Sequence, residues 1–321
     1  MEMLDLFITT LGAALRLATP LIFAALAGLF SERSGILDLG LEGKILVGAF
    51  AAAAMTTLTG WPMLGLIAAV GCSVGVGLLH GYACITHKGN QLVSGVAITV
   101  VASGLTGLLA VSWFSAGGRT PVLPPGSRFQ PIGLPGAEAL AGVPVLGPLY
   151  GTVIGGQNLL VYLALLAVPA VWFILYRTPY GLWLRSVGEN PQAVETAGIS
   201  VARVQYIAAM ASGGLCGVAG AYLSTAHGAG FVPDMTAGKG FIALAALIFG
   251  KWRPVPTLLA CLLFGFFDAG AARMQGSHLI GDIPDQAVQA LPYALTVIVL
   301  ALFVGKATAP KALGQPYIKE H

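Results

Sequence analysis

Charged side chains are concentrated in one short stretch of an otherwise apolar sequence, between Glu32 and Lys44. Asp38 and Glu42 are four residues apart, so they share a face wherever this stretch is helical, and Lys44 could neutralise one of the two carboxylates. Ionisable side chains inside a membrane are costly and usually mark a functional path. We therefore expect Asp38, Glu42 and Lys44 to line a cavity. The alternative is a turn at the membrane surface whose charges reach the lipid headgroups.

A second stretch predicts a short helix with a capping residue at each end. Asn190 is a good N-cap, Pro191 suits the first helical position, and Gly198 suits the position just past the last turn. The two turns between them, residues 192–197, are too few for a helix that is stable alone. Such a helix must pack against its own domain or in the groove of a partner, unless the stretch is a plain turn. Its small apolar face consists of Ala193, Val194 and Ala197.

A third stretch has glycines on both sides of a short apolar run. The run from Gly240 to Gly250 is too short to cross a bilayer as a regular helix, and it ends at a basic turn, Lys251 to Arg253. Broken helices at membrane depth occur where they face protein or a water-filled cavity. We expect this segment to dip in from outside, with the positive end of its dipole pointing into the membrane domain. Ordinary close helix packing is the alternative.

Signatures of enzymes and metal sites are missing from the sequence. No lysine lies in the Gly-x-x-x-x-Gly-Lys-[Ser/Thr] pattern of a P-loop, so the chain cannot be its own ATPase. No His-Glu-x-x-His pattern occurs, and the four cysteines lie in apolar runs, as small core side chains do. We expect no catalytic residue, no metal site and no cofactor in this chain, which is therefore not itself an enzyme.

The composition indicates what surrounds these stretches. The 321 residues are 56% hydrophobic and only 9% charged, whereas a soluble domain carries about 25% charged residues. This excludes a soluble enzyme and a disordered chain, and a net charge of +3 is too small to predict a nucleic acid partner. We expect an all-α, polytopic transmembrane helical bundle in the lipid bilayer, with residues 1–321 forming a single domain.

About nine membrane passages are predicted, because a spanning helix needs about 20 apolar residues. The second and seventh passages are irregular and are predicted to be broken or half helices. The expected passages are residues 7–30, 36–58, 62–86, 92–115, 158–176, 204–226, 238–250, 256–275 and 287–305. Two long connections remain, a proline-rich external loop at 116–157 and a cytoplasmic connection at 177–203 that contains the short capped helix.

Lysines and arginines predict the orientation, because they accumulate on the cytoplasmic side of a membrane protein. With the N-terminus outside and nine passages, the C-terminus is cytoplasmic. The expected inside set is Arg33, Lys88, Arg177, Arg185, Arg203, Lys251, Arg253, Lys306, Lys311 and Lys319. The expected outside set is the smaller one, Arg119, Arg128, Lys239 and Arg273.

Three stretches resemble the permease subunits of ABC importers, in the branched-chain amino acid/ribose permease superfamily. They are ERSGILDLGLEG at 32–43, RSVGENPQAVETAGI at 185–199 and TAGKGFIALAALIFGKW at 236–252. The resemblance runs from about residue 10 to residue 305 and is nearest to the nucleoside and simple-sugar permeases. It departs at Asp38 and Arg253, where relatives often carry Asn.

The resemblance implies a type II-like importer permease fold and a role for each stretch. A short cytoplasmic coupling helix, which contacts the ATPase in this family, falls on Gly188, Glu189, Asn190, Pro191, Ala193, Glu195, Ala197 and Gly198. The broken segments fall near the translocation path, which makes candidates of Asp38, Glu42, Lys44, Gly240 and Phe241. The implied location is the bacterial plasma (inner) membrane.

The resemblance also implies partners and a solute. The partners are a second homologous permease, cytoplasmic ATPase subunits that hold ATP and Mg²⁺, and an extracytoplasmic binding protein of the basic-membrane-protein type. The implied solute is a nucleoside, with a purine nucleoside favoured and a simple sugar such as ribose or galactose as the alternative. Composition alone leaves two other classes open, an ion-coupled secondary transporter in which Asp38, Glu42 or Asp268 titrates, and a membrane-embedded enzyme or scaffold.

Overall fold

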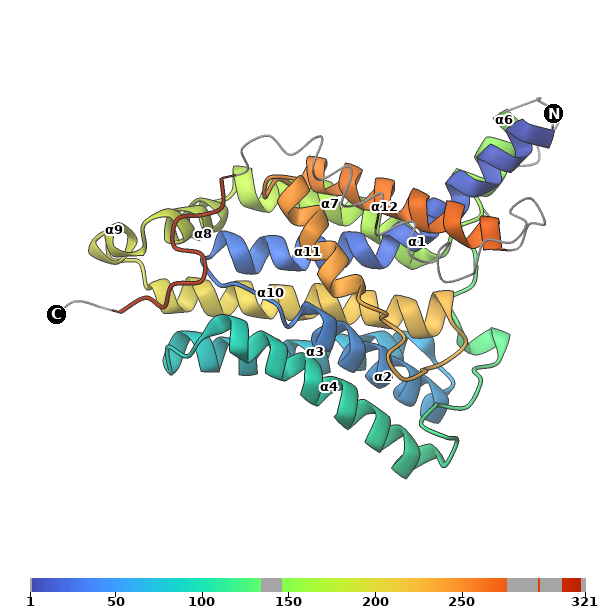
Figure 1. The fold of residues 1–321 in the computed structure, drawn as a ribbon, viewed down its shortest axis with the longest axis horizontal. Helices are drawn as coiled ribbons and strands as arrows, with labels where there is room; N and C mark the ends of the chain where they lie inside the picture. The colour runs from blue at the N-terminus through green and yellow to red at the C-terminus, as the bar shows by residue number, and fades with distance from the viewer. Residues whose placement is uncertain (1, 134–145, 276–293, 295–307, 319–321) are drawn as a thin grey trace.

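The computed structural model describes residues 2–133, 146–275, 294 and 308–318, and the regular elements in these residues are helices (Figure 1). Seven of the helical segments are long and apolar enough to cross a membrane. The long helices are α1 (Glu2–Arg33), α2 (Leu41–Thr59), α3 (Pro62–Gly81), α4 (Gln91–Phe114), α7 (Leu159–Arg177), α10 (Val201–Tyr222) and α12 (Pro254–Gln275). The shorter helices are α6 (Leu146–Leu149), α8 (Pro179–Glu189), α9 (Pro191–Thr196) and α11 (Lys239–Phe249).

Short turns of other helix types complete the elements. Two π-helical turns, η1 (Tyr82–Thr86) and η4 (Leu223–His227), prolong α3 and α10, and a third, η3 (Tyr150–Ile154), follows α6. A 3-10 turn, η2 (Pro125–Ser127), lies in the proline-rich loop. With these turns included, the observed spans Pro62–Thr86 and Val201–His227 match the predicted passages to within a few residues. The predicted ninth passage, 287–305, lies outside the described residues except for residue 294.

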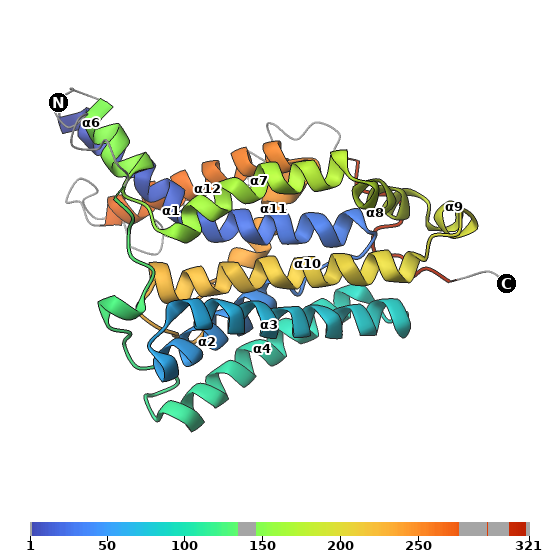
Figure 2. The ribbon, with the colours of Figure 1, turned by 180° about the vertical axis from the view of Figure 1, so that it is seen from behind.

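Helix α1 runs through the middle of the bundle, with α7 and α12 on one side and α10 on the other (Figures 1 and 2). Consecutive residues from Leu21 to Phe30 are buried on every side of this helix. By contrast, α3, α4, α7 and α12 expose many large apolar side chains, for example Val100, Leu108 and Leu166. A helix that is apolar all round belongs in a core or a membrane. The exposed apolar side chains of the outer helices therefore face lipid.

Glycines on α10 allow three helices to pack closely. A Cβ atom at Gly217 would lie 2.6 Å from the carbonyl oxygen of Ala69 on α3, and one at Gly220 would lie 2.3 Å from that of Ile45 on α2. Both distances are too short for a carbon atom, so only glycine fits. Association of helices in lipid depends on such close van der Waals packing rather than on the hydrophobic effect.

The two ends of the bundle differ. The N-terminus, α6 and the loop that follows α4 lie at one end, whereas α8, α9 and the last described residues lie at the other (Figure 1). At this second end, residues 308–318 form backbone hydrogen bonds with the end of α8 and with the turn after α1. The Ala312 amide donates to the Gly188 carbonyl (2.9 Å), and the Gly314 amide donates to the Gly35 carbonyl (3.1 Å).

Candidate functional site

The break between α1 and α2, residues 34–40, forms the centre of the site. Helix α1 ends because Gly35 adopts a positive φ of 88°, and the amides of Ser34 and Ile36 both donate to the Ser31 carbonyl. A glycine with positive φ is a common helix stop. The chain then turns back into the bundle before α2 begins at Leu41, later than the predicted start at residue 36. The reason is that residues 36–38 form no regular structure and residues 39–40 form a turn.

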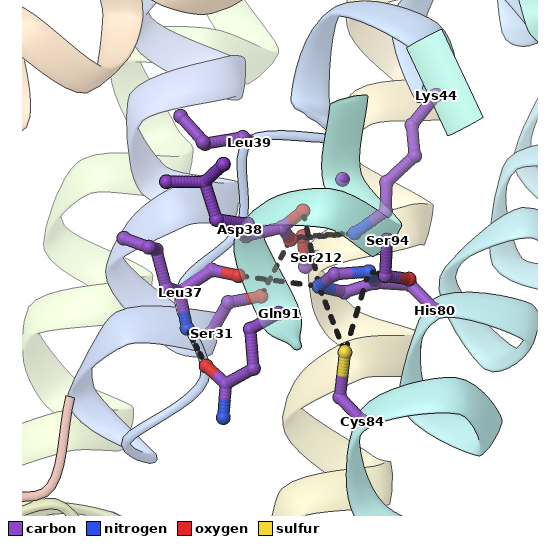
Figure 3. Close-up of polar contacts among 12 residues, drawn as sticks. Ser31, Leu37, Asp38, Leu39, Lys44, His80, Cys84, Gln91, Ser94 and Ser212 are labelled. Atoms are coloured by element: carbon purple, nitrogen blue, oxygen red, sulfur yellow. Dashed lines mark hydrogen bonds and ion pairs between the residues drawn. The ribbon is translucent and has the colours of Figure 1, made fainter. Parts of the chain in front are cut away.

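Asp38 and Lys44 form a buried ion pair inside this break (Figure 3). The Lys44 Nζ lies 2.5 Å from Asp38 Oδ2, and both side chains are fully shielded from solvent. The same carboxylate oxygen accepts hydrogen bonds from the hydroxyls of Ser31 (2.8 Å) and Ser212 (2.9 Å). A buried charge needs such partners because it has lost its hydration. The pair fixes the break to α1, α2 and α10.

A second layer of polar side chains fixes the break to α3 and α4. One ring nitrogen of His80 lies 3.0 Å from the Ser94 hydroxyl, and the other lies 3.2 Å from the Leu37 carbonyl (Figure 3). Gln91 accepts a hydrogen bond of 2.6 Å from the Leu37 amide, and the Cys84 thiol contacts His80. The second oxygen of Asp38 lies 4.0 Å from His80 Nε2 and is buried without a hydrogen bond.

The Glu42 side chain caps the N-terminus of α11. Its two carboxylate oxygens accept hydrogen bonds from the amides of Gly238 (2.8 Å) and Gly240 (2.5 Å). A carboxylate at this position satisfies free amides and complements the positive end of the helix dipole. The positive end of the α11 dipole therefore meets a carboxylate that comes from α2, and the entry of this helix from outside stays a prediction. Asp38 and Glu42 do not share a helix face, because Asp38 precedes α2.

The other end of α11 is held by the last turn of α1. The Trp252 indole donates to the Glu32 carboxylate (2.5 Å), and the Arg33 guanidinium donates twice to the Trp252 carbonyl (3.0 and 2.7 Å). Both Lys251 and Trp252 have positive φ, so the chain reverses sharply here before α12. Helix α11 has only 11 residues and is shorter than a membrane span. Two carboxylates, Glu42 at its start and Glu32 just past its end, hold this helix in position.

The predicted short helix is present as α9, with the expected caps. The Asn190 side chain accepts a hydrogen bond from the Ala193 amide (3.1 Å), and Gly198 has a positive φ of 82°. Only Val194 of its predicted apolar face is buried, whereas Ala193 and Ala197 are exposed. The Glu195 carboxylate accepts from the Val201 amide (3.2 Å), which connects α9 to the start of α10. The surface of α9 is thus open to a partner.

Helix α8 was not predicted and supports α9. Thr178 caps it by accepting from the Gly181 amide (3.2 Å), and Glu189 is its last residue rather than part of α9. A Cβ atom at Gly188 would lie 2.3 Å from the Arg33 carbonyl oxygen, so α8 packs directly on the end of α1. Burial raises the pKa of Tyr180, whose neutral hydroxyl donates to the Val204 carbonyl (3.4 Å).

Of the five predicted path residues, four form two contacting pairs in the structure, Asp38 with Lys44 and Glu42 with Gly240. The fifth, Phe241, is 46% exposed on α11. Asp38 and Lys44 have side chains that are fully shielded from solvent, and their role at a translocation path stays a prediction. The sequence alone did not indicate Ser31, His80, Ser212 and Trp252, because these partners become neighbours only in the fold. No cluster of metal-binding side chains occurs among the described residues.

Known proteins resemble this chain over nearly its whole length. The guanosine ABC transporter permease protein NupQ of Bacillus subtilis (strain 168) is 39% identical, over 99% of each chain. The nucleoside ABC transporter permease protein NupC of Lactococcus lactis subsp. cremoris (strain MG1363) is 38% identical over 94% of each chain. The putative glucose ABC transporter permease protein TsgC13 of Haloferax volcanii is 35% identical over 97% of each chain.

The family model described as branched-chain amino acid transport system, permease component, matches residues 10–300. No solved structure matches the chain. Because the family match covers most of the sequence and the relatives match from end to end, this chain belongs to that permease family and is the non-catalytic, multi-pass transmembrane subunit of an ABC importer.

Proposed function

We propose that this importer carries a nucleoside, with a purine nucleoside as the preferred solute. The observation that carries the proposal is the near end-to-end similarity to permeases for guanosine and for nucleosides, at 39% and 38% identity. A simple sugar is the second candidate, favoured by the 35% identity to the putative glucose permease.

The second permease of the importer is a related but different chain. Bacillus subtilis, Lactococcus lactis and Haloferax volcanii each have a further permease that matches this chain less well: NupP at 28%, NupB at 24% and TsgB13 at 26% identity. In each organism one permease is thus clearly more similar to this chain than the other is. This pattern favours a pair of unlike permeases, each forming half of the path. A binding protein of the basic-membrane-protein type delivers the solute from outside.

We place the cytoplasm at the end that carries α8 and α9. Arg33, Arg185 and Arg253 share one groove at this end, and Lys311 lines another. Accumulation of basic residues on one side indicates the cytoplasmic side. The C-terminus is then cytoplasmic and the N-terminus is outside, with α11 as a half helix entering from outside among about nine passages of the plasma (inner) membrane.

Helix α9 is the contact for the ATPase subunits, which supply ATP and Mg²⁺. The residues of this contact are those from Gly188 to Gly198, and Ala193 and Ala197 are exposed there for a partner. Helix α8 carries the movement of the ATPase to the end of α1, because its Gly188 packs on the Arg33 backbone. From there the break and its Asp38–Lys44 pair pass the movement to Glu42 and to α11, whose exposed Phe241 faces the path. The solute forms no covalent bond.

Uptake into membrane vesicles that contain the whole importer tests both parts of the proposal. We expect ATP-dependent uptake of labelled guanosine at least tenfold faster than that of glucose or ribose, and faster sugar uptake would favour the second candidate. Ala193→Trp should abolish uptake and co-purification of the ATPase, with membrane insertion intact. Ala309→Trp, at an exposed position of the same end outside α9, should change neither. Uptake that survives ATP depletion while a proton gradient is held would indicate an ion-coupled carrier instead.

A further inference from the structure

A basic groove lies at the end of the bundle that carries α8, away from the buried network of the break. Its volume is about 470 Å³, and it lies between the ends of α1 and α7, helix α8 and the start of α12. Three arginines line it: Arg33, Arg185 and Arg253. The aromatic side chains of Trp172 and Tyr176 form another part of its wall.

The three arginines line one groove. Among the charges that act on Arg33, that of the Glu189 carboxylate favours its own charge, whereas those of Arg185 and Arg253 oppose it. Arg33 is held by the Trp252 carbonyl, and Arg185 is stacked 4.8 Å from the centre of the Tyr176 ring. Within the described part of the chain, none of these arginines has a carboxylate within ion-pair distance. The groove is therefore a preformed site with an excess of positive charge, which suits an oxyanion.

The helices beside the groove, α8 and α12, carry exposed apolar side chains that we call its apolar rim, and one of these, Val255, lines the groove itself. Val255 and Leu259 on α12 are 50% and 62% exposed, and Leu182 and Trp183 on α8 are also exposed. An amphipathic helix with exposed apolar and aromatic side chains next to basic ones is typical of a membrane interface. A free anion would use only the arginines, whereas an amphiphile would also cover the apolar rim.

We propose that this groove binds the phosphate of an anionic phospholipid headgroup from the cytoplasmic leaflet. The phosphate oxygens accept hydrogen bonds from Arg185 and Arg253 and from the free edge of Arg33, and the acyl chains lie along Val255 and Leu259. Basic pockets between helices on the cytoplasmic side of a membrane are suited to such headgroups. The bound lipid joins α8 to the turn at Trp252, so it stabilises both elements.

Thermal unfolding of the purified full chain in detergent tests the site, with lipid titrated into the micelles. We expect phosphatidylglycerol to raise the unfolding midpoint saturably, and phosphatidylcholine or inorganic phosphate at the same concentrations to leave it unchanged. Arg253→Gln should raise the lipid concentration at half-saturation about fivefold, because each basic side chain contributes about that factor near an anionic surface. Arg185→Gln should act alike, and Arg253→Lys should retain most of the effect.

Lys251→Gln is the matched control. It removes the same charge from the same end of the molecule, but Lys251 does not line the groove. An equal loss of lipid affinity in this variant would show attraction to the general basic surface and overturn the site. Equal stabilisation by phosphatidylcholine would overturn the role of the arginines, and equal stabilisation by inorganic phosphate would overturn the role of the lipid. Native mass spectrometry of the same samples, which counts bound lipids, gives an independent readout for a variant that unfolds too readily.

Discussion

Breaking the Asp38–Lys44 pair from one side should be far more damaging than replacing both partners. In Lys44→Met, the carboxylate keeps its hydrogen bonds from Ser31 and Ser212 but loses the cation 2.5 Å away, in a site that excludes solvent. Removing one partner of a buried pair costs about 3–5 kcal/mol, because the remaining charge is uncompensated. The double variant Asp38→Asn/Lys44→Met leaves no charge, and the Asn oxygen still accepts from both serines. We expect it to lie within about 1 kcal/mol of the native chain.

The assay is thermal unfolding of the two single variants and the double variant at fixed detergent and lipid. A loss of this size should lower the midpoint by roughly 10 °C in each single variant, and the double variant should recover most of it. ATP-dependent uptake of the importer, measured on the same variants, shows whether the charge itself is needed. If the double variant loses as much stability as the two single variants added together, Asp38 and Lys44 do not act as a pair and the reasoning is refuted.

Three further outcomes follow from the packing. Gly217→Ala should destabilise the chain by about 1–3 kcal/mol in thermal unfolding, because its Cβ would lie 2.6 Å from the Ala69 carbonyl oxygen. Gly214→Ala is the control and should be neutral or stabilising, because the nearest neighbour of its Cβ would be 3.8 Å away. Equal effects of the two substitutions would contradict the close contact at Gly217. Glu42→Gln should lower the free energy of unfolding by about 2 kcal/mol and speed amide hydrogen exchange at the start of α11, because one of the two amides there loses its acceptor. Unchanged amide exchange at Gly238 and Gly240 would argue against the cap. Asn190→Ala should cost the α9 region about 1 kcal/mol and make it more sensitive to limited proteolysis, whereas the exposed Ala193→Ser, which keeps the cap, should change neither.

Features encoded within a few residues could be predicted from the sequence. Helix α9 was predicted because Asn190, Pro191 and Gly198 act through their own backbone and that of near neighbours. The long spans followed from apolar length alone. Helix α8 was missed although it carries the same type of signal, a Thr178 cap followed by Pro179. A search for caps before each short apolar pattern would have found it.

Contacts between distant segments could not be predicted from the sequence. Asp38 and Glu42 are four residues apart, which suggested one shared face, but Asp38 lies in the non-helical break before α2, so the two side chains have separate roles. Ser212 lies 174 residues from Asp38, and Trp252 lies 220 residues from Glu32. Only the packing of α10 and α11 against α1 and α2 brings these groups together. The sequence suggested a cavity lining, because a lone charge in an apolar stretch does not reveal its buried partner.

The hydrogen bonds from residues 308–318 have a consequence for the order in which the molecule is completed. The carbonyl groups of Gly35 and Gly188 belong to the first and middle parts of the chain, but their donors, the amides of Gly314 and Ala312, are synthesised near the end. During synthesis the early helices reach the membrane first, and these two carbonyls lack those donors until residues 312–314 have been made. The end of the bundle that carries α8 therefore becomes fully bonded only after that segment has left the ribosome. A chain that stops early can insert most of its helices and still lack this closure.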